Sequence, residues 1–98
     1  MTDREMLELA AKAAGVEIEW RRSAGTYYYD DPETGREEWR PLDDDGQALR
    51  LAVTLSFIDD GDWPAVTNEI YTHCNGDWFA ATRRAITIAA AKVGKGMK

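Results

Sequence analysis

Apolar and polar residues recur along the chain with two different periods, which divide it into helices and strands. The helical period comes first and predicts a helix over residues 3–14. Thr2 and Glu5 have the spacing of a capping box at its start, and Gly15 is suited to the left-handed stop that ends a helix. Val16 then supplies the apolar residue that packs behind such a stop.

The alternating period follows and predicts strands over residues 16–21, 26–30 and 37–42. Short turns at residues 23–25 and 31–35 join them, because they contain the glycine and proline that tight turns require. Strands joined by such short turns form an antiparallel meander.

The helical period returns after Pro41, where Asp43 or Asp44 is expected to cap a second helix with Gln47 as the box partner of Asp44. Its apolar stripe is expected to comprise Leu49, Ala52, Val53 and Phe57, with Leu51 and Leu55 widening it.

The last part of the chain predicts one more strand and one more helix. Residues 66–74 are rich in strand-forming side chains, and Ile70, Thr72 and Cys74 would share one face. A turn at residues 75–77 precedes a third helix over residues 78–93, which Gly94 and Gly96 are expected to end.

The expected fold is therefore α+β, in the order α-β-β-β-α-β-α, with a four-stranded, mostly antiparallel sheet packed with three helices. Residues 1–98 are expected to form a single domain, and residues 94–98 are expected to fray. The core is expected to include Trp20, Leu51, Leu55, Ala85 and Ile88.

Charge is distributed unevenly over the 98 residues, whose net value is −6. Eleven acidic residues lie between Asp30 and Asp62 against three arginines, whereas residues 78–98 hold five basic residues and no acidic one. The overall sign argues against direct binding to nucleic acid, which requires a large cationic surface. The acidic part is either a solvated surface or a face that binds a basic partner.

The residue inventory offers little for catalysis or metal binding. The single histidine, His73, neighbours the single cysteine, Cys74, so neither a disulfide nor a zinc site can form from these residues alone. The aspartate clusters lack the spacing of a calcium loop. No cofactor, metal or catalytic residue is predicted, and an enzyme would need an acid–base pair such as Asp60 and His73.

The chain has no apolar run long enough to span a membrane, and its first residues do not have the pattern of a signal peptide. We therefore expect a cytoplasmic protein.

Aromatic residues are concentrated in the predicted meander, in the segments WRRSAGTYYYD (residues 20–30) and WRP (residues 39–41). This stretch resembles a WW domain, a module that binds proline-rich peptides. The resemblance implies that Tyr28 and Trp39 line a peptide groove.

Three further segments occur in the order seen in a family of small bacteriophage proteins: TDREMLELAAKAAG (residues 2–15), WRPLDDDGQALRLAV (residues 39–53) and AATRRAI (residues 80–86). The chain is similar to this phage ABA sandwich family. The resemblance implies a phage or prophage origin, a helix–sheet–helix sandwich with its second sheet face either covered or only partly covered, and no assigned activity. The location would then be the cytoplasm of an infected or lysogenic bacterium.

These observations favour a non-catalytic phage accessory protein that binds a host or phage protein. In its sharpest form it would inhibit host defence, as an anti-CRISPR protein does, by occupying the basic channel of a nucleoprotein complex. The alternatives are a WW-like peptide-binding module and an uncharacterised enzyme, and self-association stays open.

The expected contact residues are acidic side chains with aromatic anchors among them. They are Asp43, Asp44, Asp59, Asp60 and Asp62, with Tyr28, Trp39 and Trp63. The competing hypothesis is a basic contact face on the last helix, formed by Arg83 and Arg84.

Overall fold

The computed structural model describes residues 2–56, 63–73 and 76–97 and has a mixed α+β architecture. In chain order the elements are α1 (Asp3–Ala14), β1 (Glu19–Arg21), β2 (Thr26–Asp31), β3 (Gly35–Glu38), α2 (Asp45–Thr54), α3 (Trp63–His73) and α4 (Trp78–Lys95). The predicted fold class is confirmed. The predicted order is wrong in one element, because the described residues form three strands and four helices.

Helix α1 has the predicted bounds and the predicted caps. The hydroxyl oxygen of Thr2 accepts a hydrogen bond from the backbone N–H of Glu5 at 3.1 Å. At the other end Gly15 has φ +71°, and the N–H of Val16 donates to the carbonyl of Ala11 at 2.9 Å. The last bond satisfies a carbonyl that has no partner within the helix.

The three strands form the predicted antiparallel meander in the order β1-β2-β3. The central residue Tyr28 lies opposite Glu19 on one side and Glu38 on the other. Strand β1 is shorter than predicted, and β3 is both shorter and shifted toward the N-terminus. Beyond β3, the N–H of Trp39 still donates to the carbonyl of Tyr27 at 2.8 Å.

The predicted strand over residues 66–74 is wrong, because residues Trp63–His73 form helix α3. Val66 is fully buried and Ile70 packs against the core from one turn further along. This four-residue spacing belongs to one face of a helix, and that face packs on α4. Packing therefore overrides the strand preference of the threonines and tyrosine around it.

Helix α4 is central to the helical part of the fold and packs against α1, α2 and α3. It extends through Gly94 to Lys95, so of the two glycines expected to end it Gly94 lies within the helix and Gly96 is its C-cap. Asp77 is the N-cap of the helix, because its carboxylate accepts from the N–H of Ala80 at 3.0 Å.

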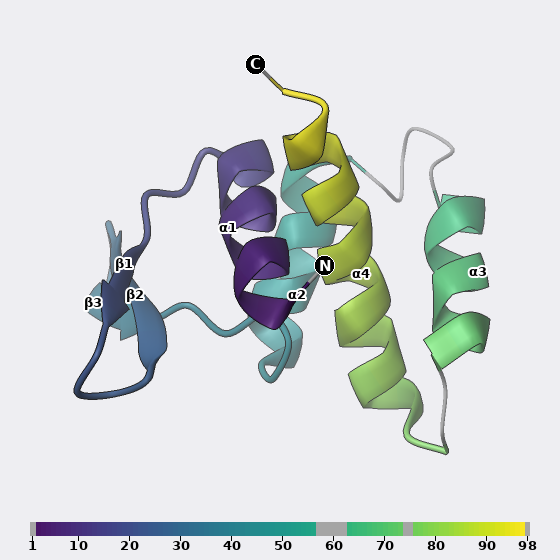
Figure 1. The fold of residues 1–98 in the computed structure, drawn as a ribbon, viewed down its shortest axis with the longest axis horizontal. Coiled ribbons are helices and arrows are strands. Elements are labelled where there is room, and N and C mark those ends of the chain that lie inside the picture. Colours follow the sequence, from purple (N-terminus) through teal and green to yellow (C-terminus); the bar gives the residue numbers. More distant parts are fainter. Residues whose placement is uncertain (1, 57–62, 74–75, 98) are drawn as a thin grey trace.

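The four helices lie on one side of the sheet in Figure 1, with α4 between α1 and α3. The arrangement differs from the expected helix–sheet–helix sandwich. The outer face of the sheet is therefore open among the described residues, and it is polar. Arg36 bridges Glu19 and Asp30 there, and the Arg21 guanidinium lies 5.4 Å from the centre of the Tyr28 ring.

The core lies between the inner sheet face and the helices, and small alanines make up much of it. Tyr27 and Trp39 are its buried aromatic residues, and both come from the sheet region. Trp20 was expected there too, but it is partly exposed: its ring packs edge-on against Tyr27, and the guanidinium of Arg4 lies over it.

Helix α2 buries only part of the apolar stripe predicted for it. Ala48, Leu51 and Ala52 are buried, whereas Leu49 and Val53 are exposed. Apolar residues occur nearly all round this helix, so the sequence does not select one face. None of the described helices is long and apolar enough to cross a membrane.

Candidate partner-binding surface

The turn between β2 and β3 is organised by the carboxylate of Asp31. One of its oxygens accepts hydrogen bonds from the backbone N–H groups of Glu33 at 2.8 Å and Thr34 at 3.1 Å. The turn closes at Gly35, whose φ of +88° is readily available only to glycine. Asp31 thus replaces the missing backbone partners of a tight turn.

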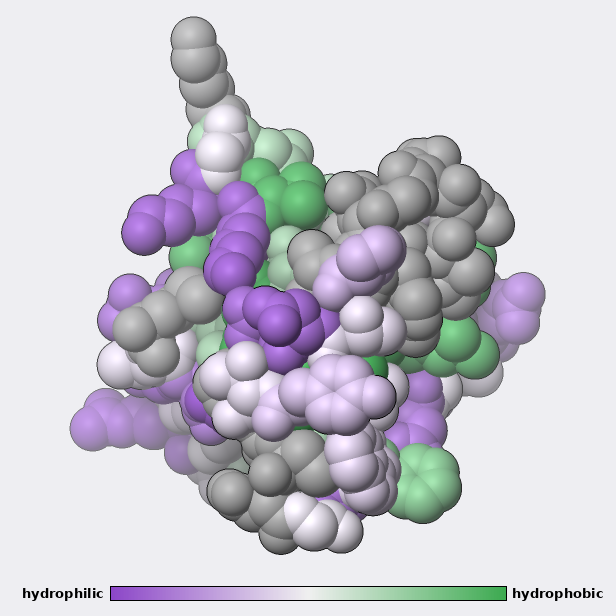
Figure 2. Space-filling model, turned by 90° about the vertical axis from the view of Figure 1, so that its right-hand side faces the viewer, coloured by the Kyte–Doolittle hydropathy of each residue, from purple (hydrophilic) through white to green (hydrophobic). Residues whose placement is uncertain are grey.

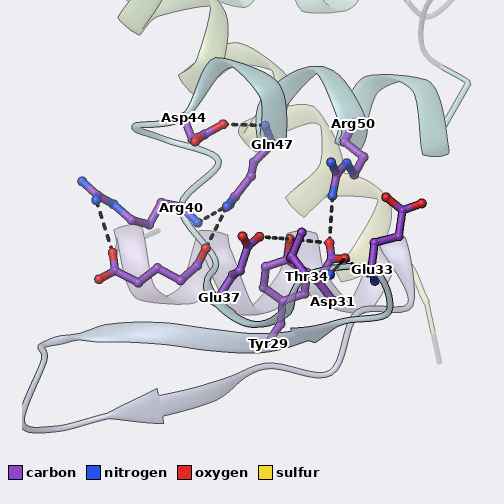
Figure 3. Close-up of polar contacts among 10 residues, drawn as sticks. Tyr29, Asp31, Glu33, Thr34, Glu37, Arg40, Asp44, Gln47 and Arg50 are labelled. Carbon is purple, nitrogen blue, oxygen red and sulfur yellow. Dashed lines mark hydrogen bonds and ion pairs between the residues drawn. The ribbon is translucent and has the colours of Figure 1, made fainter.

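The second oxygen of Asp31 connects the turn to helix α2. It accepts from the hydroxyl of Tyr29 at 3.3 Å and from the guanidinium of Arg50 at 3.2 Å, which reaches down from α2 in Figure 3. The Asp31 side chain is only 10% exposed. The backbone N–H groups of Glu33 and Thr34, and then Tyr29 and Arg50, lower the pKa of Asp31, so this carboxyl stays ionised.

The same charge affects the tyrosine beside it. Burial, followed by the negative charge of Asp31, raises the pKa of Tyr29. The phenol therefore stays protonated and acts as a hydrogen-bond donor at neutral pH.

Gln47 joins the end of β3 to the start of α2. Its amide nitrogen donates to the carbonyl of Glu38 at 2.7 Å, and its amide oxygen accepts from the N–H of Arg40 (Figure 3). Its own N–H donates to the carboxylate of Asp44 at 2.9 Å. Asp44, and not Asp43, is therefore the capping residue of α2.

A hollow of about 740 Å³ lies beside this turn, between the chain that leaves α1 and the β2–β3 hairpin. We call it the acidic hollow. Its lining contains five carboxylates and one guanidinium, contributed by Glu17, Asp30, Asp31, Glu33, Glu37 and Arg50. The guanidinium is bound to Asp31, so the remaining carboxylates set the charge of the hollow.

The carboxylates of the acidic hollow differ in how far the protein already neutralises them. Asp30 pairs with Arg36 at 3.1 Å, and Glu37 accepts from the hydroxyl of Tyr29 at 3.5 Å. Glu17 and Glu33 make no ion pair within the described part of the chain. These two are the carboxylates most available to a cation from outside.

The predicted acidic residues are only partly brought to this place. Asp43 lies 3.8 Å from the guanidinium of Arg40, and Asp44 caps α2, so both have structural roles. Asp59, Asp60 and Asp62 lie outside the described residues.

The predicted aromatic anchors are separated from one another. Tyr28 is half-buried at the centre of the outer sheet face, and its hydroxyl donates to Glu38 at 3.3 Å. Trp39 is 5% exposed and belongs to the core, and it lines only a small hollow of about 70 Å³ with Tyr29 and Gln47, so little of its surface is open to a peptide. Trp63 is the first residue of α3, and its side chain lies outside the description.

The alternative basic face is already occupied by internal contacts. Arg83 donates to the carbonyl of Leu42 at 2.9 Å and to the carboxylate of Asp45 at 2.6 Å, and its side chain is mostly buried. Arg84 pairs with Asp3 at 3.1 Å. Both arginines therefore fasten α4 to its neighbours.

Sequence reasoning missed the contribution of Glu17 and Arg50 to the acidic hollow. Both are distant from the β2–β3 turn in the sequence, and only the fold brings them together. The usable signal was Asp31 at the start of a turn, because a carboxylate that becomes buried there must be compensated by a nearby cation. Across the described ranges, no group of three potential metal ligands is assembled.

Comparison with known proteins shows no family for this chain. The chain gives no significant match to protein-family models, to curated proteins or to solved structures. Its function is therefore inferred from its own residues.

Proposed function

We propose that this chain is a non-catalytic binding protein whose acidic hollow accepts lysine or arginine side chains of a partner protein. The observation that carries the proposal is the lining of the hollow, in which five carboxylates face one guanidinium that is already paired. Carboxylates at a concave surface attract cations more strongly than the same groups on a convex one.

The turn itself supports a binding role because its geometry is held before any partner arrives. Asp31 is bound by two backbone N–H groups, Tyr29 and Arg50, so the hollow keeps its shape when empty. A rigid site loses little conformational freedom on binding, which favours affinity.

A titration with a short lysine- and arginine-rich peptide tests this function, with a glutamate-rich peptide as the negative probe. An exposed ion pair is worth up to about 1 kcal/mol, which corresponds to about a fivefold change in Kd. The Glu17→Gln/Glu33→Gln double variant should therefore bind the basic peptide about fivefold to twentyfold more weakly, with a flatter dependence on salt.

Glu5→Gln is the matched control for the single variant Glu33→Gln, because both residues are exposed and each change removes one carboxylate. Equal weakening by the two changes would mean that net charge alone attracts the peptide, and the acidic hollow would then have no specific role.

We propose a host or phage protein as the partner. A narrower version of the proposal is a nucleoprotein complex whose basic channel normally holds nucleic acid. The support is the clustering of eleven acidic residues between Asp30 and Asp62. Expression of the chain in a bacterium that carries a CRISPR defence should raise the plaque count of a targeted phage. The Glu17→Gln/Glu33→Gln variant should lose this effect, and plaque counts unchanged by the wild-type chain would rule out this form for the defence tested.

A further inference from the structure

A second hollow, of about 360 Å³, lies between α2 and α4 and has an apolar lining. Ala48 and Ile86 form its buried floor. Leu49 and Phe79 stand at its rim and are 55% and 73% exposed. We call it the α2–α4 groove. Large apolar side chains beside an apolar floor are unfavourable in water and mark a surface that another molecule covers.

The shape of the groove follows the two helices that form it. From α4 it receives Phe79, Arg83 and Ile86, which are spaced as one face of a helix is. From α2 it receives Ala48 and Leu49. A trough between two helices has the form into which a third helix can fit its own side chains.

The end of the groove at which α2 and α4 begin is acidic. Asp45 lines it but is paired with Arg83, and Asp43 lies 3.8 Å from Arg40. Asp44 and Asp77, the N-caps of the two helices, are exposed and make no ion pair within the described residues. Arg83 is the cation in the lining, and its charge is already used by Asp45 and the carbonyl of Leu42. A partner with positive charge beside its apolar residues therefore complements this end of the groove.

The neighbouring face has a different character. Figure 2, which looks onto α3, shows hydrophobic side chains scattered among hydrophilic ones. Tyr71 on α3 is as exposed as Phe79, at 73%, but its ring packs edge-on against Trp78 with 5.7 Å between centres. Tyr71 does not line the groove, which makes it a matched control for Phe79.

We infer that the α2–α4 groove binds an amphipathic helix of a partner protein, with large apolar residues on its inner face and lysine or arginine beside them. A second copy of this chain fits less well, because two copies meeting here would bring their Asp43, Asp44 and Asp45 carboxylates together. The inference does not rest on the acidic hollow, which lies at another part of the surface.

A designed helix of leucine and lysine, about fourteen residues long with leucines at the i, i+3, i+4 and i+7 positions, serves as the probe. We expect fluorescence anisotropy to show saturable binding, and amide chemical shifts to move mainly at Ala48, Leu49 and Ile86. Phe79→Ser and Leu49→Ser should each raise Kd about tenfold, as the loss of an apolar anchor does. Tyr71→Ser should leave Kd within about twofold, a change smaller than about 0.4 kcal/mol.

Because Phe79, Leu49 and Tyr71 are all exposed, their serine variants should keep the circular dichroism spectrum of the wild type. Equal weakening by Phe79→Ser and Tyr71→Ser would overturn the assignment of the groove. Equally tight binding of a peptide with glutamate in place of lysine would overturn the basic partner. A wild-type dimer that Phe79→Ser dissociates, measured by sedimentation, would replace the partner helix with a second copy.

Discussion

Gly94 of α4 lies directly against the backbone of Leu9 in α1: a β-carbon on Gly94 would lie 1.9 Å from the carbonyl oxygen of Leu9 and 2.8 Å from its carbonyl carbon. Neither atom can move without moving helix α1. The two helices can therefore approach this closely only because residue 94 has no side chain. Gly94, which was expected to end the helix, instead sets the distance between two helices.

Replacement of Gly94 by alanine should lower the free energy of unfolding by about 1–3 kcal/mol or more, because overpacking outweighs the gain of up to about 1 kcal/mol in helix propensity. Urea denaturation measures the change. Gly96→Ala is the control, since its β-carbon would meet nothing closer than 3.6 Å and should not destabilise the fold. Equal stability of the two variants would show that α1 and α4 do not meet as closely as described.

Leu51 and Leu49 lie on opposite faces of α2, and truncation should separate them clearly. Leu51 is 4% exposed and Leu49 is 55% exposed. Leu51→Ala should lower the free energy of unfolding by about 2–5 kcal/mol through the cavity it leaves. Leu49→Ala should change it by less than about 0.5 kcal/mol. The reverse ranking, measured by thermal or urea denaturation, would mean that α2 turns its opposite face to the core.

The Gln47 side chain offers a test of how β3 is attached to α2. Gln47→Ala removes two hydrogen bonds to backbone groups and should cost about 1–3 kcal/mol. Gln47→Glu keeps the acceptor for Arg40 but turns a carboxylate toward the carbonyl of Glu38. That variant should be less stable than the wild type at neutral pH. The difference in the free energy of unfolding should shrink as the pH falls, because the glutamic acid then carries a proton that it can donate to the Glu38 carbonyl. Urea denaturation near pH 7 and near pH 4 compares the two states, and a constant difference would contradict the proposed donor role.

Asp31 should make stability depend on acid. Its pKa in the folded protein is below the ordinary value of 3.8, chiefly because the N–H groups of Glu33 and Thr34 bind the carboxylate. The folded state therefore binds this proton less readily than the unfolded chain does. The resulting stabilisation is present above that ordinary value and is lost as the pH falls through the lower folded value.

Asp31→Asn keeps the acceptor for the turn but removes the charge. The wild type should be more stable than this variant at neutral pH, and the difference should shrink toward zero as the pH falls below about 4. Urea denaturation over a series of pH values measures it. A difference that grows on acidification would have the wrong sign and would refute the assigned role of the carboxylate.

The parts of the fold that local chemistry specifies could be predicted from the sequence. Thr2, Glu5 and Gly15 identify both ends of α1, and the short turns around Gly25 and Gly35 identify the meander. In each case the residues that decide the structure are close together in the chain.

The parts that depend on packing could not be predicted in the same way. Val66 and Ile70 fit one face of a helix, but Thr67, Tyr71 and Thr72 between and after them prefer strands. A surface of α4 decides between the two, and that surface exists only in the folded chain. Pro64 was the neglected signal, because proline is well tolerated in the first turn of a helix.

The same distinction between local sequence and packing applies to the candidate site. The acidic character of the region from Asp30 onward could be predicted, because charge is a property of the sequence alone. The meeting of Glu17, Glu33 and Arg50 could not, because it depends on how α1 and α2 sit against the hairpin. Trp39 illustrates the converse: its aromatic neighbours resemble a binding module, but in the fold it packs in the hydrophobic core.

The open, charged outer face of the sheet also bears on how the protein avoids aggregation. A three-stranded sheet has two edge strands, and unpaired edges can template pairing with other chains. Here the edges are β1 and β3, which are only three and four residues long. Each carries charged side chains, among them Glu19, Arg21 and Arg36. A second molecule that added a strand at either edge would have to strip water from these charges, so the short and charged edges protect the chain from fibril-like growth.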